Sequence, residues 1–238
     1  MRIEGNDYTR YECLKELCEN RKSRRTFTDA PIPEDFIEKI LSIAATSPYA
    51  SGKQNWEITV LKDRATLIRM ADAVEKKSSG LITHLDEEYA EGFREYASNF
   101  LFFKNAPAVF VLSFRSQKSI SLMLNRVPRD AEMESASSFD SEGRKMESVV
   151  SEWERDSFVK SISCVAMLVL LAAESLGLAA CYMTGPLIAE KEIGDILHLK
   201  KGRNIGAIIP VGYYDMPDST EKTTDRERTD SEQKGTAS

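Results

Sequence analysis

Histidine, cysteine and metal-ligand motifs are scarce in this sequence of 238 residues. The chain has only two histidines, and none of its four cysteines belongs to a Cys-x-x-Cys pair. A structural zinc site needs four closely spaced cysteine or histidine ligands, so we expect no metal site. Free cysteine is a small, usually buried side chain. The sequence therefore predicts space-filling free thiols at Cys13, Cys18, Cys164 and Cys181.

A long apolar segment is missing as well. The first twelve residues, MRIEGNDYTRYE, have no apolar core and do not form a secretory signal. The most apolar run, CVAMLVLLAA at residues 164–173, has about half of the ~20 residues that a membrane-spanning helix needs. We therefore expect a cytoplasmic protein with no membrane partner, in which this run forms a buried helix.

The chain has no excess of positive charge. It contains 32 lysines and arginines against 38 aspartates and glutamates, for a formal net charge of -6. Such a chain has no broad basic field, which argues against a nucleic-acid partner. The overall profile, with 42% hydrophobic and 29% charged residues, is that of an ordinary soluble globular protein.

Four cations are nevertheless concentrated in the short segment RKSRRTF, which begins at Arg21. Taken alone, such a run is most often a solvated surface. However, Arg21, Ser23 and Arg25 are two positions apart, so in an extended segment their side chains can converge on one side. Two guanidiniums and a hydroxyl match the charge and the acceptor oxygens of a phosphate. The segment is therefore a candidate site for one small anion.

Glycine-rich phosphate loops of the Walker A or dinucleotide-binding type are absent. Two other small-residue loops are present, in SPYASGKQNW at residues 47–56 and in GLAACYMTGPL at residues 177–187. Glycine and alanine allow a ligand to approach the backbone closely, and bare backbone amides can then face it. Both loops are candidate ligand-binding sites.

The periodicity of apolar residues predicts a mixture of helices and strands without strict alternation. We expect helices at 8–20, after Pro33, after Asp63, at 85–104 and at 157–176, and strands at 56–61, 106–114, 178–183 and 204–214. The helix at 85–104 has an aromatic stripe, Tyr89, Phe93, Tyr96 and Phe100, which we interpret as core. This pattern indicates an α+β fold, a modest sheet wrapped by helices.

Three segments leave alternatives open. Residues 115–156 are polar, serine-rich and weakly periodic, and they form either a mobile excursion over a site or a solvated insertion. The helix at 157–176 is apolar nearly all round, so the core or a second subunit must cover it. Residues 215–238 have almost no apolar content, and they are either disordered or an arm along another subunit.

Taken in order, the motifs resemble the FMN-dependent nitroreductase family. The segment RKSRR, Phe27 and PIPE match its usual Arg-Arg-Ser-x-Arg, phenylalanine and Pro-Val-Pro-Glu opening. SPYASGKQNW is similar to its Ala-Pro-Ser-x-x-Asn-x-Gln-Pro-Trp motif. NAPAVFVL, LLAAESLGLAACYMTGPL and IGAIIPVGYY match its later strands and apolar helix. Each motif is weak alone, but their shared order from residue 21 to about 214 makes the resemblance strong.

The resemblance implies one nitroreductase-like FMN-binding domain at residues 1–214, with the segment 115–156 as an insertion or lid and 215–238 as a tail. It implies a central, mainly antiparallel sheet wrapped by helices, in an interlocked homodimer with FMN at the subunit interface. It also implies an NAD(P)H-dependent oxidoreductase that works by a ping-pong cycle, with NAD(P)H and a small oxidised acceptor, such as a nitroaromatic or a quinone, as partners.

By the same resemblance, eleven residues form the cofactor site, and no catalytic side chain is named. Three would grip the phosphate, the two small-residue loops would line the flavin ring, and a basic residue of the tail would return to the phosphate. The phosphate residues are Arg21, Ser23 and Arg25. The ring residues are Tyr49, Ala50, Gly52 and Gln54 in the first loop and Met183, Thr184 and Gly185 in the second. The basic residue of the tail is Arg226, with Arg228 as the alternative.

The chain departs from the family pattern at three positions of the first loop. Tyr49 stands where serine is usual, Gly52 where asparagine is usual and Asn55 where proline is usual. These changes bear on the choice of substrate. Reductive dehalogenation, dehydrogenation of a ring, flavin binding with little turnover, and a domain that only binds surface anions therefore remain as alternatives.

Overall fold

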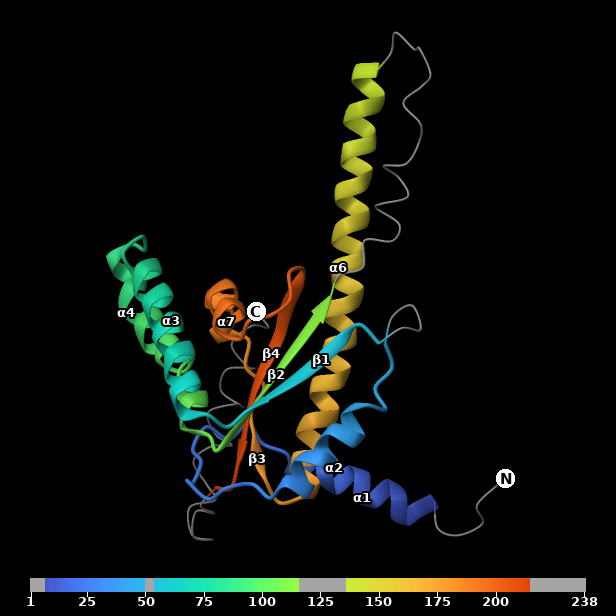
Figure 1. Cartoon of the computed structure of the whole chain (residues 1–238), viewed down its shortest axis with the longest axis vertical. Helices are drawn as coiled ribbons and strands as arrows, with labels where there is room; N and C mark the ends of the chain where they lie inside the picture. The colour runs from blue at the N-terminus through green and yellow to red at the C-terminus, as the bar shows by residue number, and fades with distance from the viewer. Residues whose placement is uncertain (1–6, 50–53, 116–135, 215–238) are drawn as a thin grey trace, which may run out of the picture.

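The computed structural model describes residues 7–49, 54–115 and 136–214. Its α-helices are α1 (Asp7–Asn20), α2 (Glu34–Ala44), α3 (Arg64–Ile82), α4 (Glu87–Ser98), α6 (Ala136–Ser175) and α7 (Glu190–Ile196). Its strands are β1 (Trp56–Leu61), β2 (Ala108–Arg115), β3 (Ala179–Ala180) and β4 (Arg203–Gly212), and two 3-10 turns are η2 (Phe102–Asn105) and η3 (Gly185–Ala189). Within these residues, six α-helices surround one four-stranded sheet, as the sequence predicts for an α+β fold (Figure 1).

The sheet is antiparallel throughout and has the order β1-β2-β4-β3. β2 pairs with β1 along its length and with β4 on its other side, with an irregularity in the register between Leu112 and Ser113. The apolar run that predicts a central strand is indeed central. β3 is only two residues long, because the predicted strand at 178–183 breaks after Ala180 and returns to β4 by a single bridge between Met183 and Ile208.

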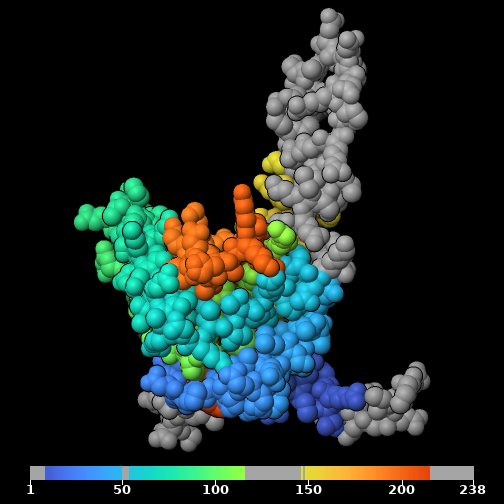
Figure 2. Space-filling model, viewed as in Figure 1, coloured from blue at the N-terminus to red at the C-terminus, as the bar shows by residue number. Residues whose placement is uncertain are grey.

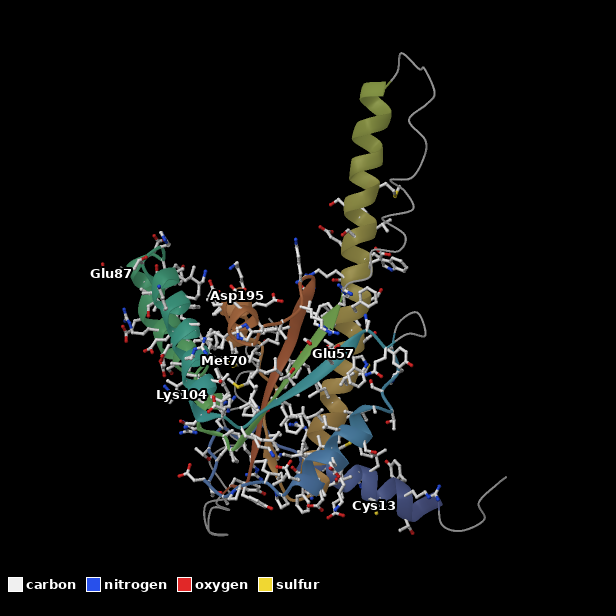
Figure 3. The ribbon with its side chains drawn as sticks, viewed as in Figure 1. Cys13, Glu57, Met70, Glu87, Lys104 and Asp195 are labelled. Atoms are coloured by element: carbon white, nitrogen blue, oxygen red, sulfur yellow. The ribbon has the colours of Figure 1, made fainter. Side chains whose placement is uncertain are left out.

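The two faces of the sheet belong to two separate cores. Along β2, Phe110 and Leu112 pack beneath α2 and α6, whereas Val109 and Val111 pack on the side of α3 and α7. This alternation follows from the period of two along a strand. Met70 of α3 is fully buried in the second core and lies between its helix and the sheet (Figure 3). Because both faces are covered, β2 is apolar at every position except Ser113 and the exposed Arg115 at its end.

Helix α6 is longer than the sequence predicts. It has 40 residues and begins at Ala136, whereas the predicted helix begins at residue 157. Its first half extends beyond the sheet (Figure 1). Met146, Val149 and Trp153 lie on one face of this half, at spacings of three and four, and all are more than half exposed. The part of the predicted insertion that follows residue 135 is therefore helical.

The same helix is apolar enough to raise the question of a membrane span. Ser148–Ser175 pass a test of length and composition, with a mean hydropathy of 1.7, and half of the apolar window is buried inside the protein. Val165 and Val169 are fully buried against the sheet and α2. The core helix of a soluble protein passes the same test. We therefore interpret α6 as the central core helix of a soluble fold, as the sequence predicts.

The aromatic stripe of the predicted helix at 85–104 is only partly core. Helix α4 ends at Ser98, and Phe100 is buried in the turn that follows it. Tyr89 and Tyr96, by contrast, are more than 60% exposed. α4 packs on α3 at the outside of the molecule (Figure 1), so only one side of it is covered. The interpretation as core is therefore wrong for both tyrosines.

The four cysteines are free thiols, as the sequence predicts, but three of them do not fill interior space. Cys13, Cys18 and Cys164 are exposed, and only Cys181 is buried. Cys13 lies on α1 (Figure 3). Cys164 lies on the part of α6 that faces away from the sheet, next to buried neighbours at positions 165 and 166. Helical periodicity explains why the adjacent residues differ so sharply in burial.

Candidate functional site

The basic segment lies along the edge of the sheet formed by β3. After α1 ends at Asn20, the chain is extended, and Ser23 forms an isolated parallel bridge with Ala180. The backbone N–H of Arg24 donates to the carbonyl of Ala180 over 3.3 Å. The segment therefore continues the sheet by one short, irregular strand, and alternate side chains point to opposite sides of it.

The side chains of Arg21, Ser23 and Arg25 lie around one buried group, the thiol of Cys181. Burial raises the pKa of this thiol. The charge of Arg25, a hydrogen bond with Ser23 and the charge of Arg21 act on the same pKa in the opposite direction. The hydrogen bond places Ser23 beside the sulfur, and both guanidiniums lie near enough for their charges to act on the thiol. Sequence reasoning assigned no role to Cys181.

Neither Arg21 nor Arg25 forms a salt bridge within the part of the chain that the structure describes. Some other cations are paired, among them Arg203 with Glu57 and Lys62 with Glu34. Two unneutralised guanidiniums beside a hydroxyl form a local positive site in an acidic protein. Such a site attracts an anion with several acceptor oxygens.

The second candidate loop lies close to the same edge of the sheet. Met183 is buried, and its N–H donates to the carbonyl of Ile208 while its own carbonyl accepts from the Ile208 N–H, both over 3.0 Å. Its backbone groups are therefore used within the protein. Thr184 is exposed and Gly185 is partly exposed. These two residues, at the start of η3, are the backbone donors that can face a ligand.

Gly185 has a packing reason to be glycine. A Cβ atom at this position would lie 2.2 Å from the Cδ1 atom of Phe100, far inside van der Waals contact. Phe100 is buried and makes an edge-to-face contact with Tyr96, with 5.0 Å between ring centroids. The loop at 183–185 therefore rests on the turn that follows α4. Phe100 is a supporting residue that the sequence analysis placed only in the aromatic stripe.

The first candidate loop lies elsewhere. Tyr49 is 36% exposed, and the Gln54 side chain reaches back to the carbonyl of Trp56 over 3.4 Å, at the start of β1. Asn55, where the family pattern has proline, is buried, and its side-chain N–H donates to the carbonyl of Arg115 over 3.3 Å. Ala50, Gly52 and Arg226 lie outside the described residues, as does Arg228.

The two groups of candidate residues occupy diagonally opposite corners of the sheet. Trp56, two residues after Gln54, aligns through β2 with Asn204 at the start of β4, whereas Ser23 aligns through β3 with Val211 at its end. The basic segment is four strand spacings from β1, about 19 Å, and the two ends are about 24 Å apart along β4. Within one chain, these groups do not meet.

Two cavities among the described residues lie away from both corners. One, of about 330 Å³, is between α7 and the start of β4 and includes Asp195 and Arg203. The other, of about 650 Å³, is between α3 and α7 and includes Leu81, His84 and Ile188. In Figure 2, the surface of α3 adjoins that of α7, which is drawn in orange. Neither cavity contains a predicted cofactor residue, which fits a site that a single chain does not enclose.

The chain matches known proteins over nearly its whole described length. The model of the nitroreductase family matches residues 18–213. The Bacillus subtilis protein named "Putative NAD(P)H nitroreductase YfhC" is 23% identical over 222 residues, which are 92% of this chain and 93% of that protein.

Solved structures agree at the level of the fold. A BluB-like flavoprotein from Clostridium difficile is 23% identical, with a TM-score of 0.68 over 90% of this chain and 96% of the other. Iodotyrosine deiodinase, in a structure bound to FMN and 3-iodo-L-tyrosine, is 19% identical, with a TM-score of 0.59 over 86% of this chain and 91% of the other. A family match over most of the chain and an antiparallel sheet wrapped by helices lead to one conclusion: the protein belongs to the nitroreductase family of flavin oxidoreductases.

Proposed function

We propose that the protein is an FMN-dependent oxidoreductase that moves a hydride from NAD(P)H to a small oxidised acceptor such as a nitroaromatic or a quinone. The observation that carries this proposal is the convergence of Arg21, Ser23 and Arg25 without a carboxylate partner among the described residues. The likeness of the fold to iodotyrosine deiodinase, whose structure is bound to FMN, supports the proposal.

The phosphate of FMN is the anion that fits this cluster. Arg21 and Arg25 supply full charge and forked N–H donors, and Ser23 supplies a hydroxyl at the sheet edge between them. The bridge between Ser23 and Ala180 fixes the backbone of the segment. The cluster therefore positions the cofactor and takes no part in electron transfer.

The loop at Thr184 and Gly185 is the candidate contact for the flavin ring. Bound FMN would accept a hydride and pass it on, which is chemistry that no side chain provides. A backbone N–H of this loop that points at the ring stabilises negative charge developing there. Because Met183 uses its N–H within the sheet, the donor comes from one of the two residues that follow it.

A second copy of the chain completes the site. Tyr49 and Gln54 lie at the corner opposite the phosphate cluster, so a ligand that contacts both groups must lie between two chains. The exposed apolar residues of α6, including Val149, Trp153 and Met167, offer surface for such an interface. We therefore propose a homodimer, located in the cytoplasm, in which Tyr49 and Gln54 of one chain approach the flavin held by the other.

The visible spectrum of the purified protein tests the enzymatic proposal. We expect a yellow protein, or one that becomes yellow with added FMN, and we expect NADH or NADPH to bleach it in the absence of oxygen. Restoration of the colour by a nitroaromatic or a quinone completes the cycle. A protein that cannot be loaded with FMN contradicts the proposal. A yellow protein that neither nicotinamide bleaches supports flavin binding with a different donor or with little turnover.

A further inference from the structure

Arg24 lies in the middle of the basic segment but has surroundings unlike those of the other cations. Its guanidinium carbon is 3.8 Å from the centroid of the Tyr214 ring. Its backbone N–H donates to Ala180, so Arg24 contacts the strand at 179–180 and the chain that follows β4 at once. It is partly buried, and its Nε atom is buried without a hydrogen-bond partner in the structure.

The neighbouring contacts hold the same two segments together. The Thr28 N–H donates to the carbonyl of Tyr213 over 2.8 Å. A Cβ atom at Gly212 would lie 3.1 Å from the ring of Phe27, which shows how closely that ring covers the end of β4. Arg24 is therefore one end of a short contact zone in which residues 24–28 lie against residues 212–214.

The alternation of side chains along the extended segment explains why the contact of Arg24 matters. In extended backbone, a residue and its two neighbours point to opposite sides, and a shift by one position would exchange the sides. Ser23 and Arg25 point to the side of the proposed phosphate-binding cluster, which they form with Arg21, so Arg24 points away from that cluster. A fixed contact for Arg24 on its own side therefore sets the direction of both neighbours.

We propose that Arg24 is a positioning residue for the cofactor phosphate: its stacking on Tyr214 holds Ser23 and Arg25 toward the cluster. This inference rests on the proposed binding of FMN and goes beyond it, because Arg24 itself does not touch the phosphate. It also distinguishes Arg24 from Lys22, although the family resemblance assigns neither residue to the cofactor site. Lys22 is exposed, whereas Arg24 is held by a ring and a backbone.

Lys22 provides the matched control. It carries the same charge as Arg24 and lies two positions before it in the same segment, so both side chains point to the same side. Lys22→Ala and Arg24→Ala therefore remove equal charge at similar places in the sequence. A loss that is due only to the weakened positive field affects both variants alike, whereas a loss of positioning affects only Arg24→Ala.

Comparison of FMN with riboflavin, which lacks the phosphate, separates positioning from general damage to the fold. By fluorescence titration of the apoprotein, we expect Arg24→Ala to weaken FMN binding about tenfold, the size of a desolvated cation–π contact. We expect its riboflavin affinity to change less than about twofold and Lys22→Ala to resemble wild type. Equal losses for FMN and riboflavin, or equal FMN losses in the two variants, overturn the inference and leave the proposed function intact.

Variants of Tyr214 keep the test decisive if Arg24→Ala does not fold. Tyr214→Leu leaves all four cations in place and removes the ring, so we expect the same selective loss of FMN affinity. Tyr214→Phe retains a ring face and should bind FMN as wild type does. An unchanged FMN affinity in Tyr214→Leu overturns the inference. Failure of the wild-type protein to bind FMN overturns the proposed function and this inference with it.

Discussion

At the scale of single residues, the four cations of the basic segment have different environments. Arg21 and Arg25 lie around the thiol of Cys181 with Ser23, Arg24 stacks on Tyr214, and Lys22 is exposed. The sequence shows only four charges of one sign. Their separation into roles comes from the extended backbone, which sends alternate side chains to opposite sides.

The phosphate cluster leads to the first prediction at this scale. Arg21→Ala together with Arg25→Ala should weaken FMN binding by about 3 kcal/mol, because each charged hydrogen bond is worth at least ~1.5 kcal/mol. That is a loss of about two orders of magnitude in affinity. Isothermal titration of the apoprotein with FMN measures it.

The matched control for the double variant removes two cations from α3. Arg64→Ala with Lys76→Ala lowers the net charge equally but at exposed positions outside the candidate site. Its FMN affinity should stay within about twofold of wild type. Equal affinities in the two double variants would show that Arg21 and Arg25 have no specific role.

The site residues could be predicted from the sequence only in part. Spacing alone predicts that Arg21, Ser23 and Arg25 can share one side of the chain, and in the structure all three act on the thiol of Cys181. Cys181 and Tyr214 could not be predicted to join them, because both are distant in sequence and reach the segment only through pairing in the sheet. Arg24 therefore resembled Lys22 until its contacts were known.

At the scale of elements, burial explains where the sequence-based prediction held. The strand at 106–114 has a continuous apolar sequence because neighbours cover both of its faces. The helix after residue 157 buries one side against the sheet and α2, and its other side carries the exposed residues Cys164 and Met167. The first half of α6 has a polar, serine-rich sequence because it extends beyond the sheet. Its only helical signal is the short stripe of Met146, Val149 and Trp153.

Helix α3 leads to a prediction about pH. The carboxylate of Asp63 caps its N-terminus, with Oδ2 accepting from the Thr66 hydroxyl over 2.6 Å and from the Thr66 N–H over 2.9 Å. The hydrogen bond from the Thr66 side chain, followed by that from its backbone, lowers the pKa of Asp63 below its ordinary value. A lowered pKa in the folded state stabilises the protein above the unfolded pKa, and this contribution is lost as the pH falls through the folded pKa.

Urea denaturation of two variants measures this contribution. At neutral pH, Asp63→Ala should have a lower unfolding midpoint than wild type, and the difference should shrink as the pH falls below the ordinary pKa of 3.8. Asp63→Asn should retain most of the capping at neutral pH, since asparagine is also a good N-cap. A difference between wild type and Asp63→Ala that is independent of pH would contradict this account.

At the scale of the whole molecule, the diagonal placement of the two candidate groups underlies the proposal that two chains form each site. If two chains form each site, two defective variants should complement one another. One variant carries Arg21→Ala and Arg25→Ala, and the other carries Tyr49→Ala and Gln54→Ala. Neither should bind FMN well alone. After unfolding and refolding together, half of the dimers are mixed and each has one intact site, so about one quarter of all sites should recover.

Light scattering provides the control for complementation. Wild type and both variants should have twice the chain mass of 26.8 kDa, which shows that the defects lie in the site and leave assembly unaffected. If refolding the two variants together restores no FMN binding, both groups act within one chain. Undiminished FMN binding by the variant at Tyr49 and Gln54 would remove that corner from the site.

The order of the strands also bears on how the protein folds during synthesis. β1 and β2 are neighbours in the sheet and can pair early, whereas β4 lies between β2 and β3 although it follows both of them in the chain. The sheet therefore closes only after β4 has left the ribosome. Contacts between distant parts of a sequence also slow folding. Until β4 emerges, the edge of β2 that it covers remains unpaired in the nascent chain, which is the stage at which a chaperone is most needed.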